Sequence, residues 1–273
     1  MLGRRRPMLF RFAASLIVLS LSACGKPSTA PRARPVSVLF VGDSLLLVND
    51  LPRVFAAIAA SRGDRVDVVV NATGGGHSTS RHALADDAFR QKKLPSKDWD
   101  FAVLQEHSAL PIIDVPGEEI APHVRALSQL IRENAARTRL VFLETWGFKD
   151  GNTENCAYAP VLCTYGSMQD ALLQAYSDMA RENNGLIAPA GEAWREVRHA
   201  RPDVELYGDD HHPSLQGTYL SACVVYAILF KKKSHGADPQ GLEPARAEAL
   251  QDAADAVVFG PKASWDRFEQ ASR

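Results

Sequence analysis

Short apolar segments alternate with longer amphipathic ones along most of the chain, and this alternation most constrains the fold. The apolar segments are rich in β-branched residues and end at glycine or polar residues, a pattern typical of buried strands. Five strands are expected, at residues 36–41, 66–70, 101–104, 140–143 and 186–188. Helices are expected at residues 51–60, 118–136, 168–183, 214–230 and 244–258, with a further polar helix after the second strand.

Strands that alternate with helices at these spacings form crossover units, which make the strands parallel and place helices on both faces of the sheet. The predicted fold class is α/β, a three-layer α/β/α domain around a parallel sheet of about five strands. Residues 36–273 suit one such domain, near the upper size for a single core. Because ligands bind at the carboxyl ends of such strands, the residues after each strand are the candidates for a site.

The N-terminal segment has the features of an export signal. Arginines at positions 4–6 precede an apolar stretch at 8–21, which is shorter than the roughly 20 residues that span a bilayer and typical of a signal peptide. Residues 21–24, Leu-Ser-Ala-Cys, resemble the lipobox of bacterial lipoproteins. The resemblance implies a signal peptide at 1–23 and lipidation of Cys24, and two or more acyl chains anchor a protein stably. An ordinary secretory signal with a chance cysteine is the alternative.

Residues 24–35 read as the lipidated cysteine and a flexible linker. The stretch after Cys24 contains three prolines and no large apolar residue, so it cannot pack into a core. Gly25 rather than aspartate follows the cysteine, and the resemblance to lipoprotein signals then favours the outer membrane over the inner one. We expect a periplasmic domain held to the membrane through a lipid anchor only.

The charge balance argues against a nucleic-acid partner. The formal net charge of the whole chain is −1. Without the four arginines of the signal, 27 basic residues stand against 32 acidic ones, a net charge of −5. No basic stripe remains of the kind that binds nucleic acid. The expected partners are therefore a small-molecule or glycan substrate and the membrane at the anchor, and the oligomeric state is open.

Three cysteines remain besides Cys24. Cys156 and Cys163 lie in one irregular loop, and an oxidising periplasm permits a disulfide between them. Cys223 lies in a long apolar segment and is expected to be a buried free thiol.

Two segments far apart in the chain carry the residue types of nucleophilic catalysis. Ser44 follows the first strand in Gly-Asp-Ser-Leu, where a helix-capping role is the alternative. Asp209 and His212 are three positions apart before a long apolar helix, and Pro213 suits the first turn of that helix. A carboxylate at this spacing orients an imidazole, which then acts as a general base toward a serine.

These two blocks, Gly-Asp-Ser-Leu at residues 42–45 and Asp-x-x-His-Pro at 209–213, resemble the first and last blocks of the SGNH (GDSL-type) hydrolases. Residues 103–108 and 217–223 resemble a bacterial SGNH-like lipoprotein subgroup. The resemblance spans nearly the whole predicted domain. It implies a flavodoxin-like fold, an esterase or acyltransferase activity, and no metal or other cofactor. It also implies that Ser44 is the nucleophile, His212 the base and Asp209 its orienting carboxylate.

The oxyanion hole of that family uses the nucleophile's own N–H, a glycine N–H after the second strand and an asparagine side chain after the third. Carried over, these are the N–H of Ser44 and that of Gly76, with Gly75 close behind. The family's asparagine block is replaced here by Gln-Glu-His-Ser at residues 105–108. Gln105 has the amide chemistry and is favoured slightly over His107, which stands at the asparagine's position. Losing one such donor typically costs about 10²–10³ in kcat.

Several other polar or aromatic residues lie near predicted strand ends: His77, His82, Glu106, Glu144, Trp146, Trp194, Tyr207 and His211. The histidines are expected to be exposed, solvated or capping more often than functional, and the two glutamates to be capping or salt-linked. The three aromatic residues suggest a wall on which a sugar could stack, although a tryptophan such as Trp194 is more often buried in the core.

The leading expectation is a serine esterase that hydrolyses a carboxylic ester, including an O-acyl group of an envelope glycan, through an acyl-enzyme on Ser44. An O-acyltransferase would use the same residues. A non-catalytic binding module is suggested by the altered third block. A metal site at residues 209–212 is the last alternative, and it is disfavoured because adjacent histidines in extended chain point to opposite faces.

Overall fold

A computed structural model of the chain describes residues 34–74, 77–113, 115 and 119–261. The predicted signal peptide, Cys24, linker residues 25–33, Gly75 and Gly76 lie outside the described residues. The described strands form one parallel sheet in the order β2-β1-β3-β4-β5, which confirms the predicted fold class. They are β1 (Val36–Gly42), β2 (Val66–Ala72), β3 (Phe101–Leu104), β4 (Arg139–Leu143) and β5 (Leu186–Ala188).

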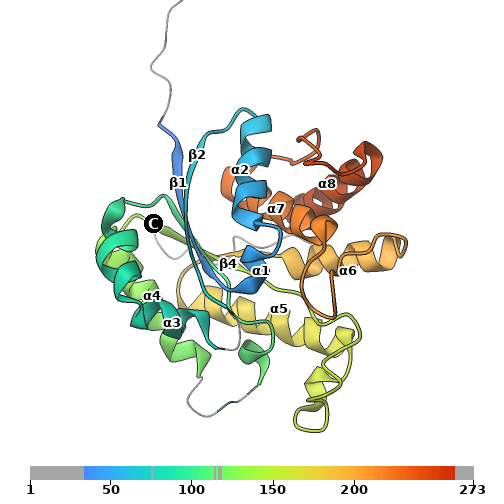
Figure 1. Ribbon diagram of the computed structural model, residues 1–273, viewed down its shortest axis with the longest axis horizontal. Helices are drawn as coiled ribbons and strands as arrows, with labels where there is room; N and C mark the ends of the chain where they lie inside the picture. Colours follow the sequence, from blue (N-terminus) through green and yellow to red (C-terminus); the bar gives the residue numbers. More distant parts are fainter. Residues whose placement is uncertain (1–33, 75–76, 114, 116–118, 262–273) are drawn as a thin grey trace, which may run out of the picture. The chain divides into compact units, whose positions relative to one another are not determined.

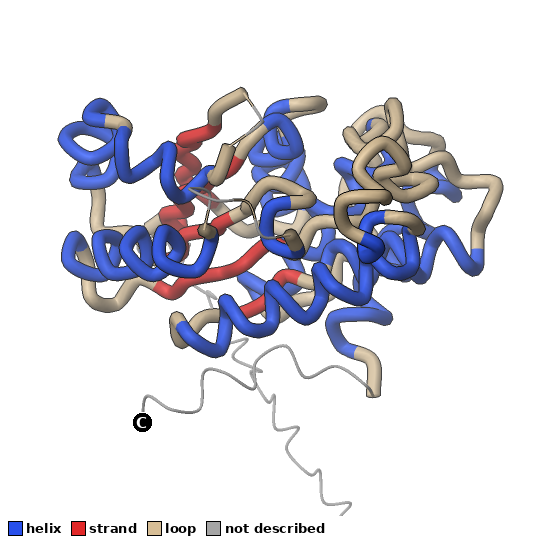
Figure 2. Tube along the Cα trace, turned by 90° about the horizontal axis from the view of Figure 1, so that it is seen from below, coloured by secondary structure: helices blue, strands red, loops and turns tan. Residues whose placement is uncertain are grey.

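Helices cover both faces of this sheet (Figures 1 and 2). The α-helices are α1 (Ser44–Leu47), α2 (Leu51–Ser61), α3 (Thr79–Ala85), α4 (Ile120–Asn134), α5 (Tyr165–Glu182), α6 (Ala190–Ala200), α7 (Leu215–Phe230) and α8 (Pro244–Phe259). Shorter helical segments are η1 (Phe89–Lys93), η2 (Leu94–Ser96), η3 (Leu110–Ile112) and η4 (Pro160–Leu162). Among the described helices, none has both the length and the apolar character to span a bilayer.

Alternate strand residues point into two separate cores, as the two-residue repeat of a strand requires. In β1, Val38 and Phe40 pack with α2, α6, α7 and α8, and the middle helix of this layer, α7, is buried almost along its whole length. Leu39 and Val41 point the other way, toward α3, α4 and α5. The strands are therefore apolar on both faces, which is why they read as continuous apolar runs in the sequence.

Two helices differ from the sequence-based expectation. Helix α6 was not anticipated, because it follows the three-residue strand β5 almost directly and its apolar positions are few. Helix α5 begins at Tyr165, three residues before the predicted start. Its first turn is stabilised by Thr164, whose hydroxyl accepts a hydrogen bond from the N–H of Ser167 at 3.1 Å, a typical N-cap.

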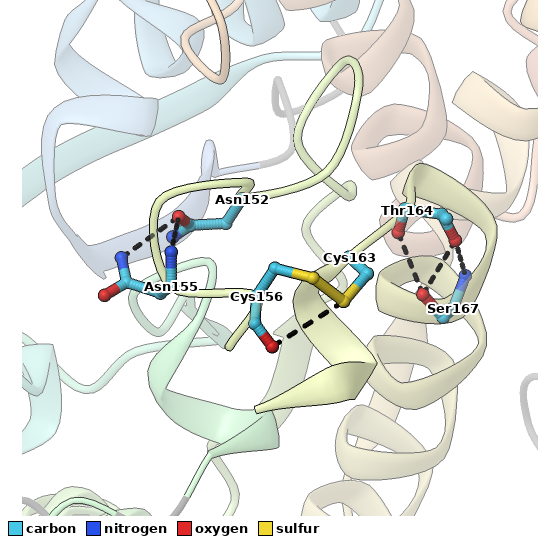
Figure 3. Close-up of a disulfide and its surroundings, with 6 residues drawn as sticks. All are labelled: Asn152, Asn155, Cys156, Cys163, Thr164 and Ser167. Carbon is cyan, nitrogen blue, oxygen red and sulfur yellow. Dashed lines mark hydrogen bonds between the residues drawn. A yellow bond between two sulfur atoms is a disulfide. The ribbon is translucent and has the colours of Figure 1, made fainter. Parts of the chain in front are cut away.

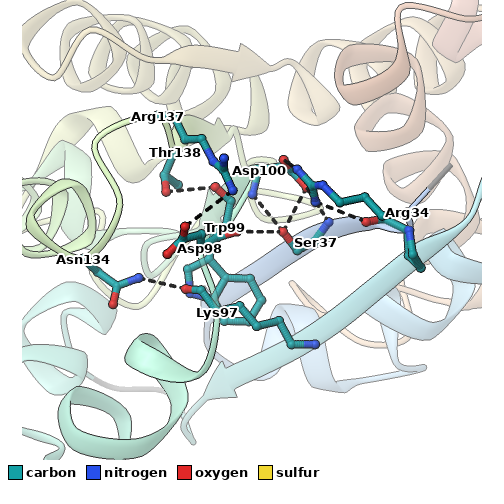
Figure 4. Close-up of polar contacts among 10 residues, drawn as sticks. Arg34, Ser37, Lys97, Asp98, Trp99, Asp100, Asn134, Arg137 and Thr138 are labelled. Carbon is teal, nitrogen blue, oxygen red and sulfur yellow. Dashed lines mark hydrogen bonds and ion pairs between the residues drawn. The ribbon is translucent and has the colours of Figure 1, made fainter.

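A polar network ties the amino ends of β1 and β3 together (Figure 4). The carboxylate of Asp100 accepts hydrogen bonds from the N–H and hydroxyl of Ser37 at 2.8 and 2.9 Å and from Arg34 at 2.7 Å. Partial burial opposes ionisation of Asp100, but these contacts hold its pKa at about 2. This end of the sheet is thus closed by structural contacts, and the opposite end carries the candidate site.

Candidate active site

Ser44 lies just after the carboxyl end of strand β1, as the first residue of the single-turn helix α1. The turn from strand to helix is tight: a Cβ atom on Gly42 would lie 2.4 Å from Oε1 of Gln105, closer than real contacts allow. Asp43 caps the helix, since its Oδ1 accepts the N–H of Leu45 at 2.9 Å. The tight turn therefore explains the glycine at position 42, and the helix cap explains the aspartate at position 43.

His212 and Asp209 lie in a closed loop before helix α7. The loop is held by a bridge between Tyr207 and Pro213 and by the N–H of Gly208, which donates to the carbonyl of His212 at 2.8 Å. Oδ1 of Asp209 accepts the N–H groups of His211 and His212 at 2.9 and 2.7 Å. The carboxylate therefore organises the loop before it meets the imidazole.

The structure brings Ser44, His212 and Asp209 into one hydrogen-bonded chain. Nδ1 of His212 lies 2.7 Å from Oδ2 of Asp209, and Nε2 lies 3.0 Å from Oγ of Ser44, across 168 positions of sequence. Partial burial opposes ionisation of Asp209, but the two backbone N–H groups and the His212 ring hold its pKa well below its usual range. An ionised carboxylate on one ring nitrogen and a serine hydroxyl on the other is the geometry of general-base activation of a nucleophile.

Of the predicted oxyanion donors, Gln105 is the one that the structure places in a different role. Its side chain is buried, its Oε1 accepts the N–H of Asp43 at 2.9 Å, and its Nε2 donates to the carbonyl of Glu106 at 2.7 Å. The amide thus braces the turn before Ser44. The slight preference for Gln105 over His107 was wrong, because a buried amide first satisfies the backbone groups around it.

His107 lies in the segment that follows β3. Its Nδ1 accepts the N–H of Ala109 at 3.2 Å, so in the neutral ring the proton is on Nε2. Burial lowers the pKa of His107; the charge of Asp43 opposes this shift, and the nearby rings of His211 and His77 add to it. The ring is therefore neutral at pH 7, with an N–H at the carboxyl end of β3, beside the strand that carries Ser44.

The other candidate histidines and glutamates have structural surroundings. His77 and His82 are exposed. Glu106 is buried and accepts the first N–H groups of α3, from Thr79 and Ser80, each at 2.9 Å, while burial raises its pKa. Glu144 is also buried, and its Oε1 accepts the amide of Gln169 at 2.7 Å; burial raises its pKa well above the usual value. Both glutamates were predicted to be capping or salt-linked. Glu106 caps α3, and Oε2 of Glu144 accepts the N–H of Glu192 in the first turn of α6 at 3.4 Å.

The predicted sugar-stacking wall is wrong. Trp146, Trp194 and Tyr207 are 2%, 0% and 5% exposed. The two indoles stack on each other at 3.8 Å with an interplanar angle of 3°, and Tyr207 packs edge-on against Trp194 at 4.8 Å. These rings form the core beneath the loop that carries His212, because large aromatic side chains are stabilised most where they are buried.

The residues after β4 clasp this catalytic loop. The indole N–H of Trp146 donates to the carbonyl of His211 at 2.9 Å, and the hydroxyl of Tyr207 donates to the carbonyl of Gly147 at 2.7 Å. The N–H of Lys149 donates to the carbonyl of Asp210 at 2.8 Å. These three bonds hold the loop without using its catalytic side chains.

The segment that follows the clasp carries a disulfide between Cys156 and Cys163 (Figure 3), as was expected for this loop. The N–H of Asn152 also donates to the carbonyl of Leu162 at 2.7 Å, which closes the same loop by a second route. Cys223 is free and fully buried in α7, as predicted. The disulfide thus stabilises the irregular loop that follows Lys149.

One argument against a metal site at this loop does not hold. The rings of His211 and His212 lie side by side, with centroids 3.9 Å apart and an interplanar angle of 38°, because the chain turns here instead of running extended. Ligand atoms of Asp209, His211 and His212 lie within 4.8 Å of one another. Both ring nitrogens of His212 are, however, already engaged by Asp209 and Ser44. Nδ1 of His211 is engaged by Asp210 at 2.7 Å, so the donors fit a triad better than an ion.

Comparison with known proteins rests on structure. No family model matches the sequence, and no curated protein matches it. A DUF4886 family protein from Bacteroides uniformis is 20% identical with a TM-score of 0.67, over 85% of this chain and 98% of that one. A Slackia heliotrinireducens protein assigned to the SGNH hydrolases is 25% identical with a TM-score of 0.57, over 71% and 98%.

A third neighbour is the acetylxylan esterase of Geobacillus stearothermophilus, 16% identical with a TM-score of 0.51, over 73% of this chain and 95% of that one. The fold of the chain is thus similar to that of proteins described as SGNH and GDSL-type hydrolases.

Proposed function

We propose that this chain is a serine esterase that hydrolyses a carboxylic ester through an acyl-enzyme on Ser44. The observation that carries the proposal is the continuous contact from Oγ of Ser44 through the ring of His212 to Asp209, at 3.0 and 2.7 Å. The fold shared with esterases supports the same activity, although fold alone does not assign function.

The first half of the reaction forms the acyl-enzyme. Oγ of Ser44 attacks the carbonyl carbon of the ester while its proton passes to Nε2 of His212, and ionised Asp209 stabilises the imidazolium at Nδ1. The tetrahedral intermediate then collapses. The C–O bond to the alcohol breaks, the leaving oxygen takes the proton from Nε2, and the acyl group stays on Ser44.

The second half hydrolyses this intermediate. A water molecule gives a proton to Nε2 of His212 and attacks the acyl carbon, and the bond to Oγ breaks as Ser44 regains the proton. In both halves the carbonyl oxygen carries negative charge. We assign its stabilisation to the N–H of Ser44, the N–H of Gly76, which lies outside the described residues, and Nε2–H of His107.

The proposal names the ester bond of the substrate and not its alcohol. An O-acyl group on an envelope glycan suits a periplasmic protein anchored at Cys24, and one structural neighbour is named for esterase action on acetylxylan. The burial of Trp146 and Trp194 removes the aromatic wall that had suggested sugar stacking. The proposal therefore rests on the ester bond and leaves the alcohol unassigned.

The proposal is tested with p-nitrophenyl esters from acetate to palmitate on the wild type and on Ser44→Ala. We expect ester hydrolysis that Ser44→Ala abolishes, labelling of Ser44 by a fluorophosphonate probe, and activity that persists in a metal chelator. Wild-type protein that is neither labelled nor active would instead favour the binding module. Activity lost in the chelator would favour the metal site.

A further inference from the structure

The two segments that carry Ser44 and His212 also carry exposed apolar side chains. Among the described residues, five large apolar side chains are exposed: Leu47, Val48, Tyr158, Leu215 and Phe259. Leu47 and Val48 follow Ser44 in the same short turn, and Leu215 is the third residue after His212. Leu47 is 51% exposed and Leu215 is 63% exposed, and such exposure is costly unless an apolar group covers it.

The helical geometry of α1 places Leu47 and Val48 on the same face as the nucleophile. Residues three and four apart on a helix are neighbours on its surface. The N–H of Val48 donates to the carbonyl of Ser44 at 2.8 Å, which closes this turn. Leu45 and Leu46, on the other side of the turn, are buried in the core. The half-buried Ser44 hydroxyl and the two exposed apolar side chains therefore face the same way.

Asn49 joins the end of this turn to the start of α7. Its side-chain amide donates to the carbonyl of Pro213 at 2.9 Å and to the hydroxyl of Thr218 at 3.2 Å. Leu215 is three residues before Thr218 and lies on the same side of α7. The exposed Leu215 thus borders the end of α1, next to Leu47 and Val48.

We propose that Leu47, Val48 and Leu215 form the acyl-binding surface of the site, here named the acyl shelf, and that the substrate carries an apolar acyl chain longer than acetyl. The inference rests on the esterase activity proposed above. An acyl group esterified to Oγ of Ser44 starts at that atom and extends over the surface around it, so the face shared with Leu47 and Val48 is within its reach. The other described rings at the site, those of His107 and His211, are polar.

The expected gain follows from the burial of methylene groups. Removing one methylene fully from water changes an equilibrium by a factor of about four. A chain lying on an open shelf is covered on one side, so about twofold per methylene is expected. From acetate to hexanoate, which adds four methylenes, kcat/KM should then rise about sixteenfold.

The test measures kcat/KM of the full chain for p-nitrophenyl acetate, butyrate and hexanoate. The variants are Leu47→Ser and Leu215→Ser, with Leu47→Met as the conservative replacement. Phe259→Ser is the matched control, because Phe259 is 41% exposed at the end of α8. We expect the hexanoate-to-acetate ratio to fall about threefold in each serine variant of the shelf, to be retained in Leu47→Met, and to be unchanged in Phe259→Ser.

A ratio near one in the wild type, or the same fall in Phe259→Ser, rejects the acyl shelf. Hydrolysis of acetate that depends on Ser44 would then still stand, so failure of the shelf is distinguishable from failure of the esterase proposal. A chain that hydrolyses none of the esters rejects both. An unchanged ratio in Leu47→Ser together with a lower mass by light scattering would make the patch a contact between copies of the chain and would also reject the shelf.

Discussion

His107→Ala tests whether the histidine after β3 replaces the asparagine donor of the SGNH hydrolases. The substitution removes the Nε2–H that we place at the carbonyl oxygen of the ester. It also removes the acceptor of the Ala109 N–H, a bond of 3.2 Å whose loss costs about 1 kcal/mol of stability. Gln105 keeps its contacts to the backbone of Asp43 and Glu106 in this variant.

The expected loss is set by charge that exists only in the transition state. One oxyanion donor is worth about 10²–10³ in kcat, or roughly 3–4 kcal/mol of barrier. KM should change little, since the ground-state carbonyl carries no full negative charge. The expected rise in the activation barrier is therefore larger than the expected loss in the free energy of unfolding. Measuring both quantities separates the two effects.

Steady-state kinetics with p-nitrophenyl butyrate gives kcat and KM, and urea unfolding gives the stability of the same variants. His107→Asn is the informative partner, because it supplies the donor that related enzymes use and should recover much of kcat. His82→Ala is the control, because His82 is exposed on α3. It should change neither quantity.

A kcat within about threefold of wild type in His107→Ala would refute this assignment. So would a loss confined to KM, since a donor that binds substrate and transition state equally well does not raise kcat.

Three further predictions concern the supports of the site. Asp209→Asn should lower kcat by on the order of 10⁴, because an amide favours the wrong tautomer of the imidazole; a loss below tenfold in steady-state kinetics contradicts the role. Trp146→Phe keeps the aromatic stack but loses the hydrogen bond to the catalytic loop, so kcat should fall about fivefold. Trp99→Phe is the control: it loses an indole hydrogen bond of the same 2.9 Å far from this loop in sequence and should not lower kcat. Replacing Cys156 and Cys163 by alanine should lower the free energy of unfolding by about 2.5 kcal/mol, as expected for so short a closed loop. Urea unfolding of the wild type with reductant, compared with the wild type without it, should show the same loss.

Most of the fold was predictable because its signals are local. The strands β1, β3 and β5 begin within one residue of their expected positions, since apolar β-branched runs between turn residues need no long-range information. Helix α6 was missed for the opposite reason. Its buried residues Ala193, Trp194 and Val197 follow helical spacing, but the helix is only 11 residues long and most of its other residues are polar or alanine.

The candidate site also contains residues that the sequence predicts and residues whose roles only the structure shows. Ser44 stands out by its place after a strand, and Asp209 and His212 by their spacing within one loop. The roles of Gln105 and His107 could not be ranked from their chemistry alone. Gln105 accepts the N–H of Asp43, the residue after β1, and that partner is in place only once β1 and β3 pair.

The sequence by itself determined the alternation of strands and helices, and it placed three residues of nucleophilic chemistry in two short motifs, because both kinds of signal are contained within a few neighbouring positions. Only the tertiary structure decided that Oγ of Ser44 meets Nε2 of His212, that Trp146 and Trp194 are buried under the catalytic loop, and that His107 has a free donor. The physical reason is that a hydrogen bond or a stacked pair depends on groups brought together by packing, as Ser44 and His212 are across 168 positions, and local periodicity carries no record of those partners.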